Sequence, residues 1–354
     1  MAENVQVRRI ADGASARVSG LFGFWPVVPP FIVGEVVPFI AVFFTNPWMS
    51  GLEFLPPPLE SAASATASGF DVAAIGSVYL ATAAGAIITA AIVLRSRVKG
   101  AALWRYASVG VLIVAIVVAI DAITPSTSLI KQLGQPMFEA TVGHYLDNRG
   151  GWFPPDGMAV FRAIVLASGI LGGIVTTLLA LAVTSLAPPP QPTTPDANET
   201  AILAAAEELA RRVRDLKHLL FAAGAILFAG TAFLKAWSSW PLAFWPTPAP
   251  GSSVPDPVAD FKIVEAALVN HQAIYFVLLI VAIFAPMAYW LSVAGREIAR
   301  EDPAVKRDPA KMKTWLAQHR ITLSIAEQAQ QIVAILLPLF AAPLADFFRS
   351  LLGY

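Results

Sequence analysis

The residue best suited to chemistry in this chain is Glu35, which lies in a long and otherwise uncharged stretch. Its neighbours Pro30, Gly34 and Pro38 make a straight helix difficult, because proline removes a backbone N–H and crowds the preceding turn. Carbonyls freed in this way must be buried in protein or line a wet cavity. Broken helices that bind ions near mid-membrane are typical of transporters. We therefore expect Glu35 to line a route for a proton or a small solute.

Two plainer explanations of Glu35 stay open. The side chain could be a neutral, hydrogen-bonded glutamic acid packed against a neighbouring helix. Alternatively, the span could begin later in the sequence, which would put Glu35 near the inner surface of the membrane rather than at its middle.

A second candidate pair lies near the C-terminus. Glu327 and Gln331 are four residues apart, which places them on one face of a helix, and Arg105 is expected at a depth where it could pair with Glu327. Ionisable groups inside a membrane are costly and are therefore functional candidates. We expect Glu327 and Gln331 to line the same route as Glu35.

Other chemistries find little support in the sequence. The chain has no cysteine, which excludes disulfides, thiolate metal sites and a cysteine nucleophile. His144 and Asp147 are spaced like metal ligands on one helical turn, but such a pair is weak evidence, so we predict neither a metal nor a cofactor. The common nucleotide-binding and hydrolase motifs are absent, and we expect no enzyme. The formal net charge of zero gives no reason to expect a nucleic-acid partner.

The elements that position these residues are predicted to be transmembrane helices. The 354 residues are 56% hydrophobic and only 14% charged, whereas soluble proteins carry about 25% charged residues. A span needs about 20 mostly apolar residues. The stretches that fit are Leu21–Phe44, Val72–Leu94, Ala101–Ile120, Ala163–Ala187, Leu219–Trp240, Gln272–Gly295 and, more weakly, Ile321–Leu344.

The predicted fold is therefore all-α, a polytopic integral membrane bundle of six to seven transmembrane helices. The seventh stretch holds several polar residues as well as Pro338 and Pro343. It could be a kinked span, which we favour, or a re-entrant segment or an interfacial helix.

The loops between these stretches alternate between basic and nearly free of Lys and Arg. Most of the 24 Lys and Arg lie in the N-terminal tail and before the third, fifth and seventh stretches. Because basic loops stay in the cytoplasm, we predict a cytoplasmic N-terminus and a cell membrane of the bacterial inner-membrane type. The opposite loops are long and place Trp beside Pro, as in Trp240-Pro241. They could form an aromatic belt at the headgroups or ordered loops that pack over the bundle.

These patterns divide the chain into six segments. They are a cytoplasmic tail (1–20), helices one to four with two long outer loops (21–187), a Pro-rich linker and amphipathic helix (188–218), helices five and six with a Trp/Pro-rich outer loop (219–295), a basic cytoplasmic segment (296–320) and the kinked C-terminal membrane or re-entrant helix (321–354).

Two cytoplasmic helices are predicted. The first is expected to continue unbroken into the fifth span, and one side of it carries the apolar seam Leu209, Val213, Leu216 and Leu220. The seam could lie on its own bundle, on the bilayer or on a second subunit. The second helix begins at Asp308-Pro309, an N-cap followed by proline at the first helical position. Its basic residues and Trp315 suit contact with anionic lipid headgroups.

Small residues mark faces on which helices can approach closely. Gly169 and Gly173 are four residues apart in the fourth stretch, and Ala81 and Gly85 repeat the spacing in the second. The pattern fits a tight bundle or a homo-oligomer equally well.

We therefore hypothesise a multi-pass membrane protein that transports or conducts a small solute or ion, with intramembrane carboxylates lining the route. The alternative is a non-catalytic membrane subunit, scaffold or sensor of a larger complex, which would use its outer loops and cytoplasmic helix to contact partners. An enzyme that acts on lipids is less favoured, because the candidate groups are predicted at different depths.

Overall fold

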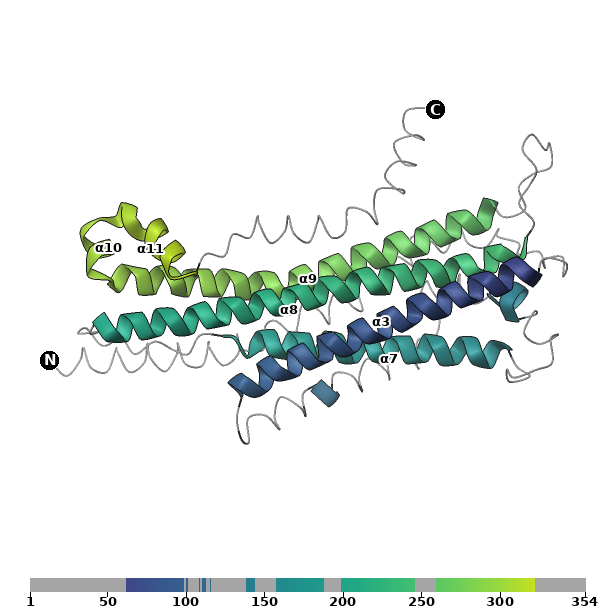
Figure 1. Cartoon of the computed structure of the whole chain (residues 1–354), viewed down its shortest axis with the longest axis horizontal. Helices are drawn as coiled ribbons and strands as arrows, with labels where there is room; N and C mark the ends of the chain where they lie inside the picture. The colour runs from purple at the N-terminus through teal and green to yellow at the C-terminus, as the bar shows by residue number, and fades with distance from the viewer. Residues whose placement is uncertain are drawn as a thin grey trace, which may run out of the picture.

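The computed structural model describes residues 62–98, 100, 108, 110–112, 115, 138–143, 157–187, 199–245 and 259–321. Within these residues the regular structure is entirely helical, without a strand. Four long helices run side by side along the long axis of the molecule (Figure 1): α3 (Ala62–Arg97), α7 (Gly157–Thr184), α8 (Glu199–Ser239) and α9 (Ala259–Glu301). The shorter elements are η4 (Glu139–Gly143), η5 (Trp240–Phe244), α10 (Pro303–Arg307), η6 (Pro309–Lys311) and α11 (Met312–Gln318).

The four long helices share two ends, which we name by their residues. The basic end holds Arg97 at the close of α3, Arg212 near the start of α8, and α10 and α11 after α9. The Trp end holds Trp237 and Trp240, where α8 passes into η5. Helices α3, α7 and α9 run from the Trp end to the basic end, and α8 runs the opposite way (Figure 1).

All four helices are long and apolar enough to cross a membrane, within the segments Ser68–Arg97, Leu166–Thr184, Thr200–Phe244 and Leu268–Glu301. They contain the second and sixth predicted stretches and nearly all of the fourth and fifth, which end at Thr184 and Ser239 in the structure. These four stretches are thereby confirmed as apolar helices of spanning length. Lipid offers the backbone no hydrogen-bond partner, so an apolar run of this length satisfies its N–H and C=O groups inside a helix. The first stretch, and the seventh apart from Ile321, lie outside the described residues. The third is described only at Ser108, 110–112 and Ala115.

Helix α8 is longer than a membrane requires. Its 41 residues extend about 60 Å at 1.5 Å per residue, about twice the 30 Å of the hydrocarbon core. Its charges lie before Leu219, with the exception of Lys235. The apolar part that begins at Leu219 is therefore the part suited to lipid, and the first five turns extend beyond it. The predicted unbroken continuation into the fifth span is confirmed.

The predicted apolar seam of α8 is buried within its own chain. Leu209 is 3% exposed, and Val213 and Leu216 are each 1% exposed. These residues belong to the same buried cluster as Ile298 of α9 and Trp315 of α11. The burial of apolar area on α9 and α11 is what stabilises a helix that lipid does not surround, so this seam is not available to join two subunits.

Beyond α9 the chain folds back on itself (Figure 1). Asp302 caps α10 by accepting hydrogen bonds from the backbone N–H groups of Ala304 and Val305, and its second oxygen accepts one from the indole N–H of Trp315 at 3.0 Å. Asp308 caps η6 through the N–H of Ala310, as its Asp-Pro sequence predicted. Trp315 is only 6% exposed, so the expectation that it contacts lipid headgroups is wrong. The ring is held by Asp302 and lies in the protein.

Gly295 permits this fold-back. A Cβ atom at this position would lie 2.7 Å from Cγ2 of Ile321 and 3.4 Å from Cδ2 of Leu209. Ile321 is β-branched and only 2% exposed, so it could make room only by changing its χ1 rotamer inside a packed core or by moving its main chain. Glycine is therefore required where α9, α8 and the chain after α11 meet.

We predict that Gly295→Ala lowers the thermal unfolding midpoint of the purified protein in detergent by several degrees. Overpacking of a tight core contact costs about 1–3 kcal/mol, which outweighs the better helix propensity of alanine. Gly85→Ala is the matched control, because a Cβ there meets no described atom within 4 Å. Equal midpoints for the two variants would contradict the tight contact at Gly295.

Candidate functional site

The predicted route residues lie outside the described part of the chain. They are Glu35, Pro30, Gly34, Pro38, Glu327 and Gln331. Their roles stay predictions.

The predicted small-residue faces contact no described helix. Ala81 and Gly85 are exposed, and a Cβ on Gly169 or Gly173 would meet no described atom within 4 Å. Helix α3 instead turns another row of small residues toward the core, namely Ala83, Ala86 and Ala90, at 0%, 2% and 1% exposure. The close approach of α3 to the bundle is thus achieved by alanines, and the packing role of the other face stays a prediction.

A cavity of about 40 Å³ lies between α3, α7, α8 and α9. One of its lining residues, Thr176, is near the middle of the apolar segment Leu166–Thr184, so the cavity lies at the level of the middle of that segment. Among the described residues its walls are aliphatic and aromatic, and their only polar side chains are the hydroxyls of Tyr79 and Thr176. No charged side chain of the described part lines it.

Tyr79 is held firmly beside this cavity. Its ring stacks on Phe233 with a centroid distance of 5.5 Å and an interplanar angle of 3°. Gly230 leaves room for the ring, since a Cβ there would lie 3.3 Å from Tyr79 Cε2. The residue is 9% exposed, and its hydroxyl has no hydrogen-bond partner among the described residues. Because an unsatisfied buried polar group costs about 1–3 kcal/mol, this hydroxyl favours a hydrogen-bonding molecule in the cavity.

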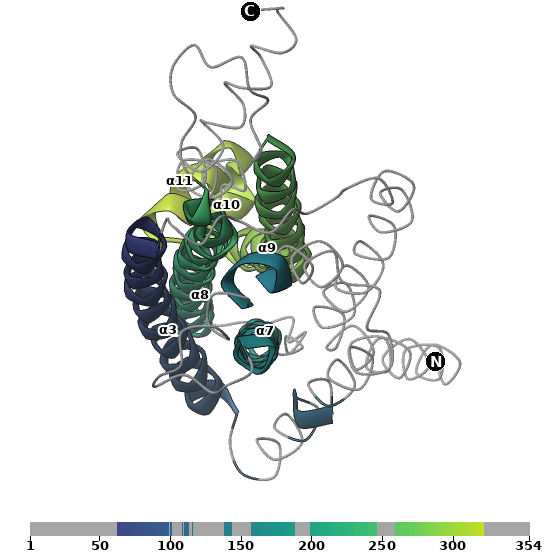
Figure 2. The same cartoon turned by 90° about the vertical axis from the view of Figure 1, so that its right-hand side faces the viewer.

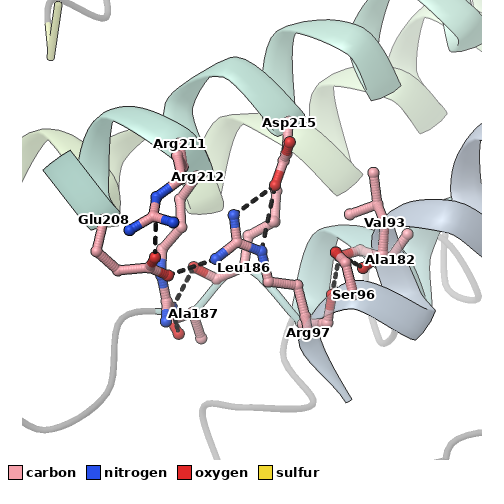
Figure 3. A network of polar contacts seen from close by, with 11 residues as sticks. Val93, Ser96, Arg97, Ala182, Leu186, Ala187, Glu208, Arg211, Arg212 and Asp215 are labelled. Carbon is pink, nitrogen blue, oxygen red and sulfur yellow. Dashed lines mark hydrogen bonds and ion pairs between the residues drawn. The ribbon is translucent and has the colours of Figure 1, made fainter. Parts of the chain in front are cut away.

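A network of charged side chains closes the basic end of the bundle (Figure 3). We call it the basic-end clamp and define it as Arg97, Glu208, Arg212 and Asp215. Arg97 of α3 donates to Glu208 Oε1 and to Asp215 Oδ2, both on α8. Glu208 and Asp215 are seven residues apart, which keeps them on one helix face. One arginine thereby bridges two helices.

Arg212 extends the clamp to α7. Its Nε donates to Glu208 Oε1 at 3.0 Å, and its Nη1 donates to the carbonyl oxygens of Leu186, at 3.1 Å, and Ala187 (Figure 3). Carbonyls that follow the last turn of a helix have no partner inside it. The clamp therefore satisfies the end of α7 and ties α3, α7 and α8 together.

The clamp also sets the charge state of Glu208, which lies outside the apolar part of α8. Partial burial raises the pKa of this carboxyl, but the hydrogen bond from Arg212 and the charges of Arg97, Arg212 and Arg211 outweigh burial and lower the pKa below its ordinary value. A carboxyl with a lowered pKa stabilises the fold above its ordinary pKa and loses that contribution as the pH falls through the lowered value. The Glu208 carboxyl is therefore ionised at neutral pH.

The Trp end is held by aromatic packing rather than by charge. Phe138 stacks on Trp237 with centroids 5.0 Å apart, and Trp240 meets both rings edge-on. Trp237 is 8% exposed, and the hydroxyl of Ser239 donates to Glu265 of α9. Of the two explanations for the Trp-Pro loops, this packing supports an ordered loop for residues 240–245.

Sequence reasoning missed both the clamp and the cavity. The seven-residue spacing of Glu208 and Asp215 was a usable signal for the clamp. It places two carboxylates on one helix face, where an arginine at the end of a neighbouring span, such as Arg97, can form ion pairs with both. The cavity left no such signal, since apolar walls look like any packed core. In the part of the chain that the structure describes, no group of three or more His, Asp or Glu is placed to hold a metal. His144 and Asp147 lie outside it.

We predict that Arg97→Ala lowers the thermal unfolding midpoint in detergent, while Arg95→Ala, an exposed arginine two residues away, leaves it nearly unchanged. The loss follows because hydrogen bonds to charged groups contribute about 1.5–3 kcal/mol and Arg97 is only 13% exposed. Similar midpoints for both variants would show that the clamp is a solvated surface pair.

Comparison with known proteins gives no further guide. No protein family, no curated protein and no solved structure matches this chain. The features that bear on function are therefore the cavity, which lies at the middle of the apolar segments, and the contacts that hold the helices together at the two ends of the bundle.

Proposed function

We propose that this is a multi-pass protein of the cell membrane that transports or conducts a small solute or ion through the helical bundle. The observation that carries the proposal is the cavity between α3, α7, α8 and α9, at the middle of the apolar segments. Binding sites near mid-membrane, between helices, are where transporters hold their solute.

The energetics of the cavity support this proposal. An empty space of about 40 Å³ costs on the order of 1 kcal/mol in lost contacts, at about 24 cal/mol per Å³. The unpartnered hydroxyl of Tyr79 adds a further cost. A molecule that fills the space and hydrogen-bonds to Tyr79 recovers both terms, so the site favours occupation.

The carboxylates of the route complete the proposal. The described lining has hydroxyls but no charge, so an ion or a coupled proton needs another partner along the path. Glu35 in its Pro- and Gly-broken stretch, and Glu327 with Gln331, would supply it.

The proposed orientation puts the basic end in the cytoplasm. Of the basic residues in the described helices, only Arg162, Lys235 and Lys262 lie toward the Trp end, and cytoplasmic segments carry the excess of Lys and Arg. Arg97 lies at the basic end and Phe138 beside Trp237, so the intervening chain connects the two ends, as the predicted third span requires. Gly110 in that stretch lies against Leu181 of α7.

One observation favours a second candidate, a membrane subunit or scaffold. The charged half of α8 before Leu219, the end of α9 and the α10–α11 fold-back form a packed unit at the basic end, which could contact a partner. Purification in mild detergent separates the candidates. A defined hetero-complex, with no flux through the isolated protein, would favour the scaffold.

For the carboxylates, we predict that Glu35→Gln and Glu327→Gln each reduce solute or ion flux into proteoliposomes by at least about tenfold, the effect of losing about 1.4 kcal/mol. Glu297→Gln, an exposed glutamate of α9, is the control and should keep wild-type flux. The proposal fails if both route variants transport like the wild type.

For the cavity, we predict that water-soluble reagents reach position 176 but not position 177. The chain has no cysteine, so Thr176→Cys and Thr177→Cys each create a single thiol. Thr176 lines the cavity, whereas Thr177 is 8% exposed and faces Gly110. The measurement is the rate of modification by a small cationic thiosulfonate in intact proteoliposomes. A Thr176→Cys thiol that reacts only after denaturation would mean a dry cavity and would remove the main support for transport.

A further inference from the structure

One face of α8 carries basic side chains just before Leu219, where the apolar part of the helix begins, and aromatic side chains just after it. Arg214, Lys217 and His218 are exposed, and Phe221 and Phe228 are 71% and 44% exposed. Positions 214, 221 and 228 are seven residues apart and so stay on one face of the helix. These five residues form one continuous surface, which we call the α8 strip.

The charges of the strip differ from those on the opposite side of the same helix. Arg212 is held by Glu208 and the α7 carbonyls, and the two acids Glu208 and Asp215 are both engaged by Arg97. Arg214 and Lys217 form no ion pair within the described residues. Glu208 and Asp215 are therefore used by the clamp. The exposed Glu207 lies seven residues before Arg214 on the same face, so Arg214 and Lys217 still leave the strip with a net positive charge.

The depth of the strip matches the boundary of a bilayer. The apolar part of α8 begins at Leu219, and Arg214 lies about 7 Å before it at 1.5 Å per residue. The headgroup layer is about 5–8 Å thick on each side of the hydrocarbon core. Arg214, Lys217 and His218 thus lie at headgroup level, while Phe221 and Phe228 lie at the level of the acyl chains.

We infer that the α8 strip binds an anionic phospholipid, with its phosphate between Arg214 and Lys217 and an acyl chain along Phe221 and Phe228. A soluble anion would use the basic residues alone and leave the aromatic continuation without a role. A phospholipid uses both parts in the order in which the helix presents them. Each Lys or Arg near an anionic headgroup strengthens binding by about fivefold, equivalent to about 1 kcal/mol.

This site is separate from the cavity and does not depend on transport. It also differs from the sequence-based expectation, which placed lipid contact on α11. There Trp315 is buried on Asp302, so the basic residues of the α10–α11 fold-back have no exposed tryptophan beside them. This difference provides a control at the same end of the molecule.

The test is native mass spectrometry of the full-length protein after incubation with phosphatidylglycerol or phosphatidylcholine of the same acyl chains. The wild type is expected to retain phosphatidylglycerol at least fivefold better than phosphatidylcholine. Arg214→Gln/Lys217→Gln is expected to bring that ratio close to one, and added salt should lower the wild-type ratio because it screens exposed charges.

The matched control is Arg307→Gln/Lys313→Gln, which removes the same charge from exposed positions of α10 and α11. It should keep the wild-type ratio. Equal retention of both lipids by the wild type would overturn the inference, as would an equal loss in both double variants.

The aromatic part of the strip is tested by Phe221→Ala, which leaves the charges in place. This variant should weaken the retention of both lipids together. Thermal unfolding of each variant checks that its fold is intact.

Discussion

The packing of α8 against its neighbours is the constraint on which the rest of the described structure depends. Helix α8 packs most extensively on α3 and α9 and also contacts α7 (Figure 2). Its buried side continues from Ile202 to Leu227, through both the charged and the apolar parts of the helix. The same face therefore organises the bundle in two solvents, by hydrophobic burial in water and by close packing where lipid gives no hydrophobic drive. The cavity, the clamp and the α8 strip are all positioned by the rotation of this one helix.

The helices are held together by different interactions at the two ends of the bundle. At the basic end, charged side chains satisfy one another and the last carbonyls of α7, an arrangement that suits a watery boundary where ions stay hydrated. At the Trp end, Phe138, Trp237 and Trp240 pack as rings, which suits an interface where aromatic side chains have one apolar and one polar neighbour. Between the two ends the described lining of the cavity has only hydroxyls to offer a solute. In the proposed transport function, a charge that passes would therefore need another partner, the role proposed for Glu35 and Glu327.

The helices were predictable because length and apolarity dictate them, whereas the contacts between helices were not. Backbone groups in lipid must be satisfied locally, so Val72–Leu94 and Gln272–Gly295 could be identified from composition alone. The helix start at Asp308-Pro309 was predictable for the same reason, because an N-cap depends only on neighbouring residues. Asp302-Pro303 has the same Asp-Pro sequence and also caps a helix, but it was not predicted. By contrast, the pairing of Arg97 with Asp215 depends on how two distant helices are rotated. The same holds for the choice of Ala86 over Gly85 as the packing face of α3, because both faces carry small residues.

Helix α8 connects the cavity to the basic end of the bundle as one unbroken helix. It continues without a proline from the cavity wall at Leu227 to Glu199, a distance of about 42 Å at 1.5 Å per residue. Helix α9 contains Pro286, which deprives the carbonyl of Ala282 of its N–H donor, immediately beside the cavity-lining residues Ile283 and Phe284. The break in α9 thus lies beside the wall that α8 forms, because the two helices pack on each other. The clamp and the buried seam tie the charged half of α8 to α3, α7 and α9. A tilt of α8 by about 10° at the cavity would therefore move Glu199 by about 7 Å and would have to carry these neighbouring helices with it.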